Sequence, residues 1–193
     1  MVGLFLIFTG FVSVASGEEP VRVSRDDCNL SFVVPKGVEY IEMRGVISAG
    51  EDECYVAFAY TGDLRVESVG NLPSTTEDWR AMTDFALTVK GISLVDSLAQ
   101  IQSADGMLRK GLFKIISKEH VSLPGGDLYM FRFVAENSSK TMIDPREARG
   151  VVFVAGNNNR SIVFPFYSGW KLSGADKERE KIFRKLFSSI GFM

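Results

Sequence analysis

The sequence has little of the chemistry on which most enzymes depend. It contains a single histidine, His120, so zinc sites and Ser-His-Asp triads, which need a histidine together with its partners, have one candidate at most. No Gly-x-Ser-x-Gly, Gly-x-Gly-x-x-Gly, Gly-Lys-Ser or His-Glu-x-x-His pattern occurs. We interpret His120 as a surface residue of an extended segment. The sequence therefore predicts a protein that is not an enzyme and has no catalytic, cofactor or metal residues.

An excess of one charge is also missing. The 22 Lys and Arg residues are balanced by 24 Asp and Glu residues, which leaves no basic footprint for nucleic acid. There is no internal repeat and no low-complexity linker. Eighteen glycines and six prolines, mixed with many aromatic residues, favour an ordered globular domain over a disordered chain. Nucleic acid is thus excluded as an expected partner.

The one long apolar run lies at the start of the chain. Val2–Val14 is almost entirely apolar, and small residues follow it up to Gly17, as signal peptidase requires. No Lys or Arg precedes the run, which is atypical of a signal peptide. About thirteen residues span roughly 20 Å as a helix, short of a hydrocarbon core of about 30 Å. We therefore predict that residues 1–16 form a signal peptide, cleaved after Ser16 or Gly17. A retained membrane anchor and a buried helix are the less favoured alternatives. The mature protein is expected in the periplasm or outside the cell, without a stable membrane span.

The two cysteines, Cys28 and Cys54, follow this signal and are expected to form a disulfide, as paired cysteines of exported proteins usually do. The absence of Cys-x-x-Cys argues against a redox role. Each cysteine opens an alternating stretch, 28–34 and 54–60, and 38–47 is a plausible strand between them. The outer strands of such a meander lie about 9.6 Å apart, too far for a disulfide, which needs about 4.4 to 6.8 Å between Cα atoms. Either the two strands are direct neighbours, or the cysteines lie beyond the end of the middle strand, which we favour.

Acidic residues precede both cysteines, at Asp26-Asp27 and at Glu51-Asp52-Glu53. A disulfide would bring the two clusters together, and carboxylate oxygens are ligands that Ca²⁺ accepts. No spacing matches a known calcium loop, so solvated loops are the simpler interpretation. Whether these clusters bind a cation stays open at this point.

Further along the chain, Ser74 and Glu77 form a capping-box pattern ahead of apolar residues at helical spacing, which are Trp79, Met82, Phe85, Ala86 and Val89. We predict a helix that ends at Gly91. The next stretch, 92–101, fits neither helix nor strand spacing. A final helix is predicted over 174–189, capped by Ser173.

Two hairpins are predicted between these helices. The first joins 112–123 to 128–135 around Pro124-Gly125-Gly126-Asp127. The second joins 151–155 to 162–167 around Gly156-Asn157-Asn158-Asn159-Arg160, where asparagine tolerates the left-handed backbone that such a turn uses.

The opening Leu30-Ser-Phe-Val-Val-Pro35-Lys-Gly37 resembles the start of PsbP-like domains. So does the end, with 151–154, a turn, 162–164 and a helix that finishes in Phe187-Ser-Ser-Ile-Gly-Phe192. The resemblance implies an α+β fold, an antiparallel sheet of about six strands with helices packed on it in an α/β/α arrangement. We place a single domain over 28–193, after an N-terminal extension over 17–27. Members of this family are photosystem extrinsic subunits, partners of small GTPases or exported bacterial proteins; only the last class suits an exported chain. The resemblance transfers no functional residue.

Three functions follow from these observations. The leading hypothesis is an exported, non-enzymatic domain that binds a protein or a component of the cell envelope. A second is a small-molecule or lipid-binding module, with a pocket between sheet and helix lined by Trp79, Phe85 and Trp170. A third is a hydrolase built on carboxylates. An apolar-walled pocket would favour the second, and carboxylates that converge in a cleft would favour the third.

Overall fold

A computed structural model describes residues 20–42, 53–64, 83–136 and 143–193. Within them, a seven-stranded antiparallel sheet has the order β3-β4-β5-β9-β8-β7-β6, and a small sheet has the order β1-β2-β10. The large sheet consists of β3 (Val38–Ile41), β4 (Glu53–Tyr60), β5 (Phe85–Lys90), β6 (Phe113–Leu123), β7 (Gly126–Ala135), β8 (Arg149–Gly156) and β9 (Ser161–Ser168). The small sheet consists of β1 (Arg22–Arg25), β2 (Leu30–Val33) and β10 (Gly191–Phe192). The helices are α2 (Leu94–Gln102) and α3 (Gly174–Ser188), with short 3-10 turns η1 (Asp26–Cys28), η2 (Gly62–Leu64) and η4 (Pro145–Glu147).

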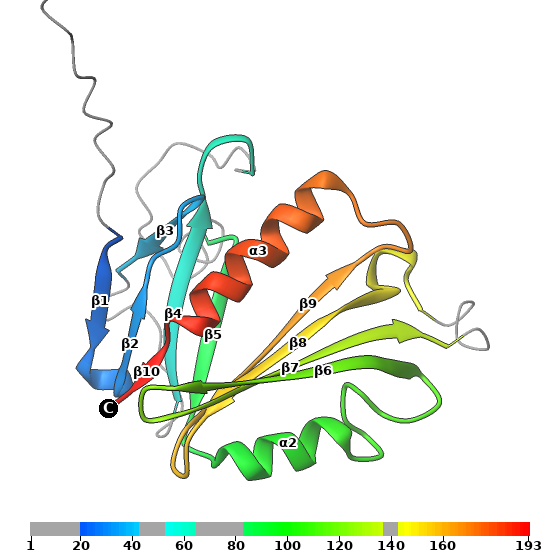
Figure 1. Cartoon of the computed structure of the whole chain (residues 1–193), viewed down its shortest axis with the longest axis horizontal. Coiled ribbons are helices and arrows are strands. Elements are labelled where there is room, and N and C mark those ends of the chain that lie inside the picture. The colour runs from blue at the N-terminus through cyan, green and yellow to red at the C-terminus, as the bar shows by residue number, and fades with distance from the viewer. Residues whose placement is uncertain (1–19, 43–52, 65–82, 137–142) are drawn as a thin grey trace, which may run out of the picture.

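The elements form three layers, with the large sheet in the middle (Figure 1). The helix α3 and the small sheet cover one face, and α2 covers the other. This is the predicted α+β architecture in its α/β/α arrangement. Part of the segment predicted as an N-terminal extension, 17–27, contributes β1 and η1 to the small sheet.

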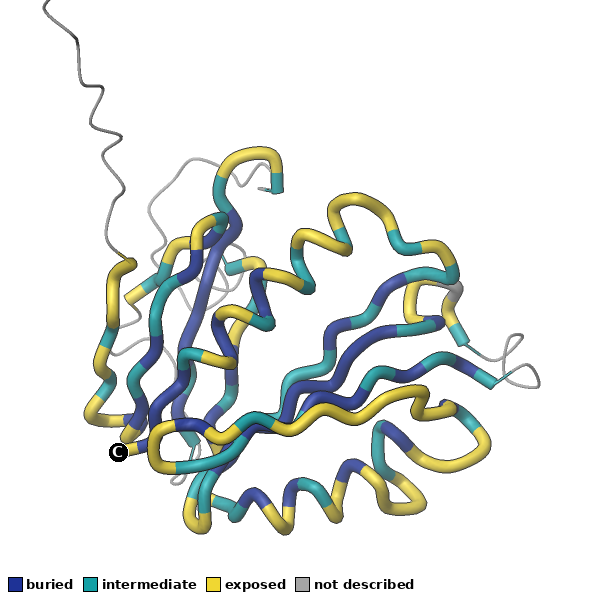
Figure 2. The backbone as a smooth tube through the Cα atoms, in the orientation of Figure 1, coloured by how far each residue is buried: buried dark blue, intermediate teal, exposed yellow. Residues whose placement is uncertain are grey.

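The central strands β7 and β8 pack on both faces of the large sheet, whereas most of the edge strand β6 is exposed (Figure 2). In β7, Leu128 and Met130 face α3, whereas Phe131 and Phe133 face α2. The α3 side holds the larger core, in which Phe153 stacks on an α3 phenylalanine with ring centroids 4.8 Å apart. Burying a large side chain of this kind stabilises the fold by roughly 1.5 to 3 kcal/mol, so the aromatic α3 face dominates the packing.

The C-terminal helix begins where its capping pattern predicts. The Ser173 hydroxyl accepts from the Asp176 N–H at 3.0 Å, and the Asp176 carboxylate accepts from the Ser173 N–H at 3.1 Å. This reciprocal capping box satisfies two backbone donors that a helix N-terminus otherwise leaves open. The predicted helix over 174–189 is confirmed and ends one residue earlier, at Ser188.

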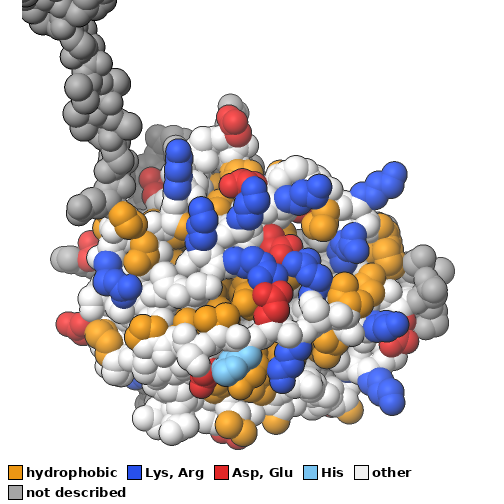
Figure 3. All heavy atoms as spheres, in the orientation of Figure 1, with side chains coloured by type: hydrophobic (Ala, Val, Ile, Leu, Met, Phe, Trp, Pro, Cys, Tyr) orange, Lys and Arg blue, Asp and Glu red, His pale blue; other side chains and the backbone are white. Residues whose placement is uncertain are grey.

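An ion-pair network joins α3 to the sheet. Glu180 accepts from both nitrogens of the Arg132 fork on β7 and from Arg184 Nε at 3.1 Å. Arg184 also donates to both carboxylate oxygens of Glu119 on β6, at 2.8 and 3.0 Å. Figure 3 shows the α3 face, where acidic side chains gather among basic ones. The network fixes the rotation of α3 over the strands.

Both predicted hairpins are confirmed, β6 with β7 and β8 with β9. The expected left-handed asparagines of the second turn are not found, because Asn29 is the one non-glycine residue with positive φ in the described ranges. Instead, the Asn157 side-chain oxygen accepts from the N–H groups of Asn159 and Arg160, at 2.9 Å each. The carboxamide thus supplies the turn's hydrogen bonds without a left-handed residue.

The helix predicted to end at Gly91 is wrong in its last part, and its first part, 74–82, lies outside the described residues. Phe85–Lys90 is strand β5, paired with β4 on one side and β9 on the other. Phe85, Leu87 and Val89 all pack on the α3 face at period two. The helix that follows begins instead at Leu94, within the stretch that fitted neither spacing, and the Ser93 hydroxyl caps it by accepting from the Asp96 N–H at 3.1 Å.

Candidate binding depression beside the disulfide

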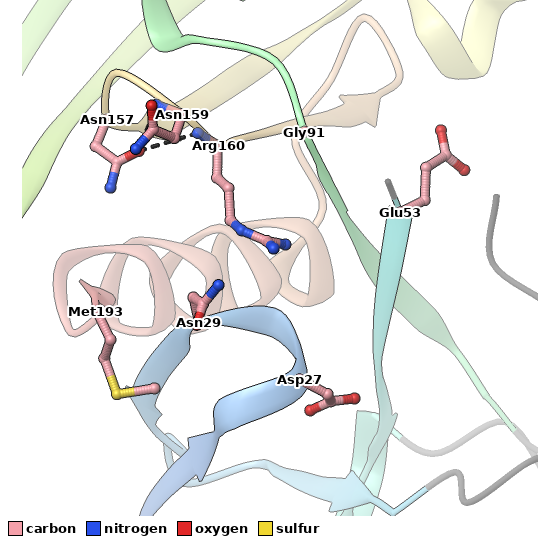
Figure 4. A pocket seen from close by; sticks show the side chains of 8 residues that line it. All are labelled: Asp27, Asn29, Glu53, Gly91, Asn157, Asn159, Arg160 and Met193. Atoms are coloured by element: carbon pink, nitrogen blue, oxygen red, sulfur yellow. Dashed lines mark hydrogen bonds between the residues drawn. The ribbon is translucent and has the colours of Figure 1, made fainter. Parts of the chain in front are cut away.

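A polar depression of about 420 Å³ lies at the end of the molecule where η1, the start of β4 and the β8-β9 turn meet (Figure 4). We call it the disulfide-end depression. It is lined by Asp27, Asn29, Glu53, Gly91, Asn157, Asn159, Arg160 and Met193. Most of these residues carry a charge or a carboxamide, so the depression is suited to polar ligands and not to apolar ones.

The disulfide lies next to this depression and joins η1 to β4. Cys28 and Cys54 stand at disulfide-bonding distance, with Cα atoms 5.5 Å apart and both side chains buried. The two cysteine-bearing segments are not neighbouring strands, because β2 and β4 belong to different sheets. The favoured alternative agrees with the described pairing, since β3 pairs with β4 only as far as Ile41 opposite Ala57 and Cys54 lies beyond that point. Cys28 lies in η1 and not at the start of a strand, and the strand predicted between the cysteines is described as β3, which ends at Ile41. The disulfide therefore ties the small sheet to the large one.

Asp27 is held firmly on one wall of the depression. Arg25 donates from Nε to Asp27 Oδ1 at 2.8 Å and from Nη2 to Oδ2 at 2.6 Å, a bidentate pair. The remaining Arg25 nitrogen donates to the Tyr40 hydroxyl at 2.8 Å. The hydrogen bonds from Arg25 lower the pKa of Asp27, against a smaller opposing effect of burial. Both carboxylate oxygens are therefore occupied, and the group stays ionised.

Glu53 is the second acidic residue of the depression. Its carboxylate lies 3.5 Å from Lys90 Nζ and accepts from the Tyr55 hydroxyl at 3.2 Å. Of the two predicted acidic clusters, the structure thus brings Asp27 and Glu53 to one depression, while Glu51 and Asp52 lie outside the described residues. Each of the two placed carboxylates has its own cationic neighbour.

Metal ligation has no support in the described ranges. The one group of three potential ligand residues there consists of Asp27, Cys28 and Cys54. Both sulfur atoms of that group are committed to the disulfide, and the Asp27 oxygens to Arg25. A soft thiolate site would need free thiolates, so this arrangement does not provide a metal centre.

Arg160 is the cation of the opposite wall, and sequence reasoning missed it. With the Asn29 carboxamide oriented to satisfy both neighbours, its oxygen accepts from Arg160 Nη2 at 3.1 Å and Nε at 3.3 Å, and its nitrogen donates to the Asp26 carbonyl at 3.2 Å. Figure 4 shows the guanidinium directed into the depression between Asn29 and Gly91. Arg160 makes no ion pair with any residue in the described ranges. The turn around it was predicted, but nothing local indicates that η1 faces it.

The other predicted site residues do not assemble into a pocket. Phe85 packs against Phe183 of α3, with ring centroids 5.0 Å apart, whereas Trp170 belongs to the cluster on the α2 face. The predicted lining by Phe85 and Trp170 is therefore wrong, since the sheet separates them, and Trp79 lies outside the described residues. His120 lies on the exposed surface of β6, with Nε2 2.8 Å from Asp127 Oδ1 and its ring stacked on Tyr129 at 4.6 Å. No helix of the described residues is long and apolar enough to cross a membrane.

No family model and no curated protein matches the chain. Among solved structures, the chain is similar to cyanobacterial PsbP (CyanoP) from Synechocystis sp. PCC 6803, with 17% sequence identity and a TM-score of 0.44. The match covers 97% of this chain and 99% of that one.

Proposed function

We propose that the protein is an exported, non-enzymatic domain that binds a protein or a component of the cell envelope at the disulfide-end depression. One observation carries this proposal. The depression is polar and is built from five segments far apart in the sequence, and it contains a guanidinium without an ion-pair partner among the described residues. A cation that the fold itself does not neutralise favours recognition of an external group.

The two alternative functions receive less support. A carboxylate hydrolase needs one acid whose pKa is raised so that it can donate a proton. In the depression, the hydrogen bonds from Arg25 instead lower the pKa of Asp27, and Glu53 lies beside Lys90. A small-molecule module would need an apolar-walled pocket, and the predicted lining residues lie on opposite faces of the sheet.

Export is part of the same proposal. The apolar run ending before Gly17 and a buried cysteine pair at bonding distance both suit a protein that matures in an oxidising compartment. Intact-mass spectrometry of the protein purified from its native compartment tests this. We expect loss of 1–16 or 1–17 and a mass about 2 Da below that of the reduced form. A mature mass that retains Met1 would contradict signal cleavage.

Site-specific photocrosslinking tests the binding surface. A photoreactive residue at Asn159, exposed at the rim of the depression, should crosslink to one partner in the native envelope fraction. The control carries the same residue at Lys171, also exposed but beyond the opposite end of β9. Equal crosslinking at the two positions, or none at Asn159 in cells that contain all their native components, would contradict the proposed site.

A further inference from the structure

Arg160 occupies a rigid position in the turn immediately before β9. The Asn157 side chain accepts from the Arg160 N–H at 2.9 Å, and the Asn157 N–H donates to the Arg160 carbonyl at 2.9 Å. The Asn157 carbonyl in turn accepts from the first N–H of α2, that of Leu94, at 2.8 Å. The turn is therefore tied to a helix as well as to its own strands, and little conformational entropy is lost when the side chain it carries binds a ligand.

The guanidinium is also oriented by a contact outside its own hairpin. Its Nε and Nη2 donate to the Asn29 side-chain oxygen, and no described residue accepts a hydrogen bond from Nη1. Asn29 itself is fixed, because its N–H donates to Asp26 at 3.1 Å and its carbonyl accepts from the Met193 N–H at 3.0 Å. Asn29 adopts φ of 47°, a left-handed conformation that asparagine tolerates better than most residues. The neutral carboxamide positions the arginine without neutralising it.

Among the charged residues that line the depression, Arg160 is the one without an oppositely charged partner in the described ranges. Asp27 is paired with Arg25 and Glu53 with Lys90, whereas Arg160 has a neutral partner. Asparagine side chains at 157 and 159 lie at the same rim (Figure 4). A planar, permanently charged fork among carboxamide donors is the arrangement that proteins use for carboxylates.

We propose that Arg160 anchors a carboxylate of the bound partner, so that the disulfide-end depression recognises an acidic side chain of a protein. The free Nη1 edge donates to the carboxylate, and the carboxamide groups at the rim are placed to donate further hydrogen bonds. This inference deepens the proposed function and rests on it. The occupant to which we commit is a protein carboxylate, because the Asp27–Arg25 and Glu53–Lys90 pairs leave one guanidinium charge uncompensated, which a single carboxylate matches.

The test is a titration followed by nitrogen-15 NMR on the mature, oxidised protein. The probe is the peptide acetyl-Gly-Glu-Gly-amide, with acetyl-Gly-Gln-Gly-amide as the matched neutral probe and inorganic phosphate as a third. We expect the glutamate peptide to shift the Arg160 Nε–H signal and the Gly91 and Asn29 amide signals, with a dissociation constant in the millimolar range. The glutamine peptide should bind at least about tenfold more weakly, since it lacks the charge-assisted pair.

Two variants and a control make the test specific. Arg160→Gln should weaken glutamate binding at least about tenfold, and Arg160→Lys should restore only part of it because lysine lacks the fork. The control is Arg109→Gln, an exposed arginine between α2 and β6, which should bind as the unaltered protein does. A dispersed amide spectrum and an unchanged melting temperature establish that each variant is folded.

Three results would overturn the inference. These are equal binding of the glutamate and glutamine peptides, undiminished binding by folded Arg160→Gln, and phosphate binding that is tenfold tighter than the glutamate peptide. The photocrosslink at Asn159 separates this inference from the proposed function. A crosslink that persists in Arg160→Gln would support the binding site but contradict the carboxylate anchor. If the unaltered protein gave no crosslink at Asn159, the proposed binding site itself would be contradicted.

Discussion

Replacing Cys28 and Cys54 by alanine should lower the free energy of unfolding by about 3.5 kcal/mol. The value comes from the sequence separation of 26 residues, which a disulfide closes into a loop in the unfolded chain. Closing such a loop removes entropy of about 12 cal/mol/K from the unfolded state, which is about 3.5 kcal/mol at 25 °C. For a chain of this size, the loss corresponds to a melting temperature lower by roughly 7 to 14 °C.

The assay is urea unfolding at pH 7, followed by circular dichroism, of the oxidised protein and the double alanine variant. The unaltered protein with a reducing agent is the matched control, because it loses the crosslink and keeps both sulfur atoms in the core. It should lose about the same 3.5 kcal/mol, and the variant should lose somewhat more, since both cysteine side chains are buried. A loss below about 1 kcal/mol in both samples would refute the loop-closure reasoning.

Three further predictions concern the core and its ion pairs. Burial alone would raise the pKa of Glu180, but hydrogen bonds from Arg132 and Arg184 outweigh it and lower the pKa. The stability that ionised Glu180 contributes is therefore fully present above its unfolded pKa of about 4.3, and it is lost as the pH falls through the lower folded pKa. In urea unfolding, Glu180→Gln should lower the free energy of unfolding by about 1 to 3 kcal/mol at pH 7 and by less at pH 3.5. Burial raises the pKa of Tyr60 to about 12. The unfolded chain ionises at a lower pH, near 10, so the free energy of unfolding should fall between about pH 10 and pH 12. Thermal melts of Tyr60→Phe over that range should lack the part of the fall that Tyr60 causes. Gly150→Ala should cost at least about 2 kcal/mol in urea unfolding, because the new Cβ would overlap a backbone carbonyl oxygen of β9; a stability within 0.5 kcal/mol of the unaltered protein, about the usual effect of a surface substitution, would contradict that overlap.

Local chemistry explains which elements were predictable. The hairpins and the C-terminal helix depend on turn residues and on the Ser173 capping box, all within a few neighbouring positions. The spacing of Phe85, Ala86 and Val89 is also that of a helix. The segment is nevertheless a strand, β5, because it pairs with β4 and β9. Tertiary pairing overrides such spacing because β5 buries Leu87 and Val89 at period two on the α3 face, while Ala86 and Lys90 are exposed.

The candidate site was less predictable than the fold because it depends on contacts between distant segments. The proximity of Asp27 to Glu53 followed from the expected disulfide. The approach of Arg160 to Asn29 did not, since it needs the β8-β9 turn to meet η1, and no residue pattern near either one indicates the other. The division into two sheets was missed for the same reason: β2 takes one of its neighbours from the C-terminal β10.

That last pairing has a consequence for biogenesis. The strand β10 closes the small sheet against β2, and Phe192 N–H also donates to the Pro124 carbonyl in the β6-β7 turn at 2.9 Å. A chain that emerges from a ribosome or a translocation pore in order, N-terminus first, therefore exposes one edge of β2 until Gly191 and Phe192 have emerged. The cysteines are only 26 residues apart and emerge early. Oxidation of that pair would hold η1 on β4 during the interval and keep the unfinished sheet in place for its closing strand.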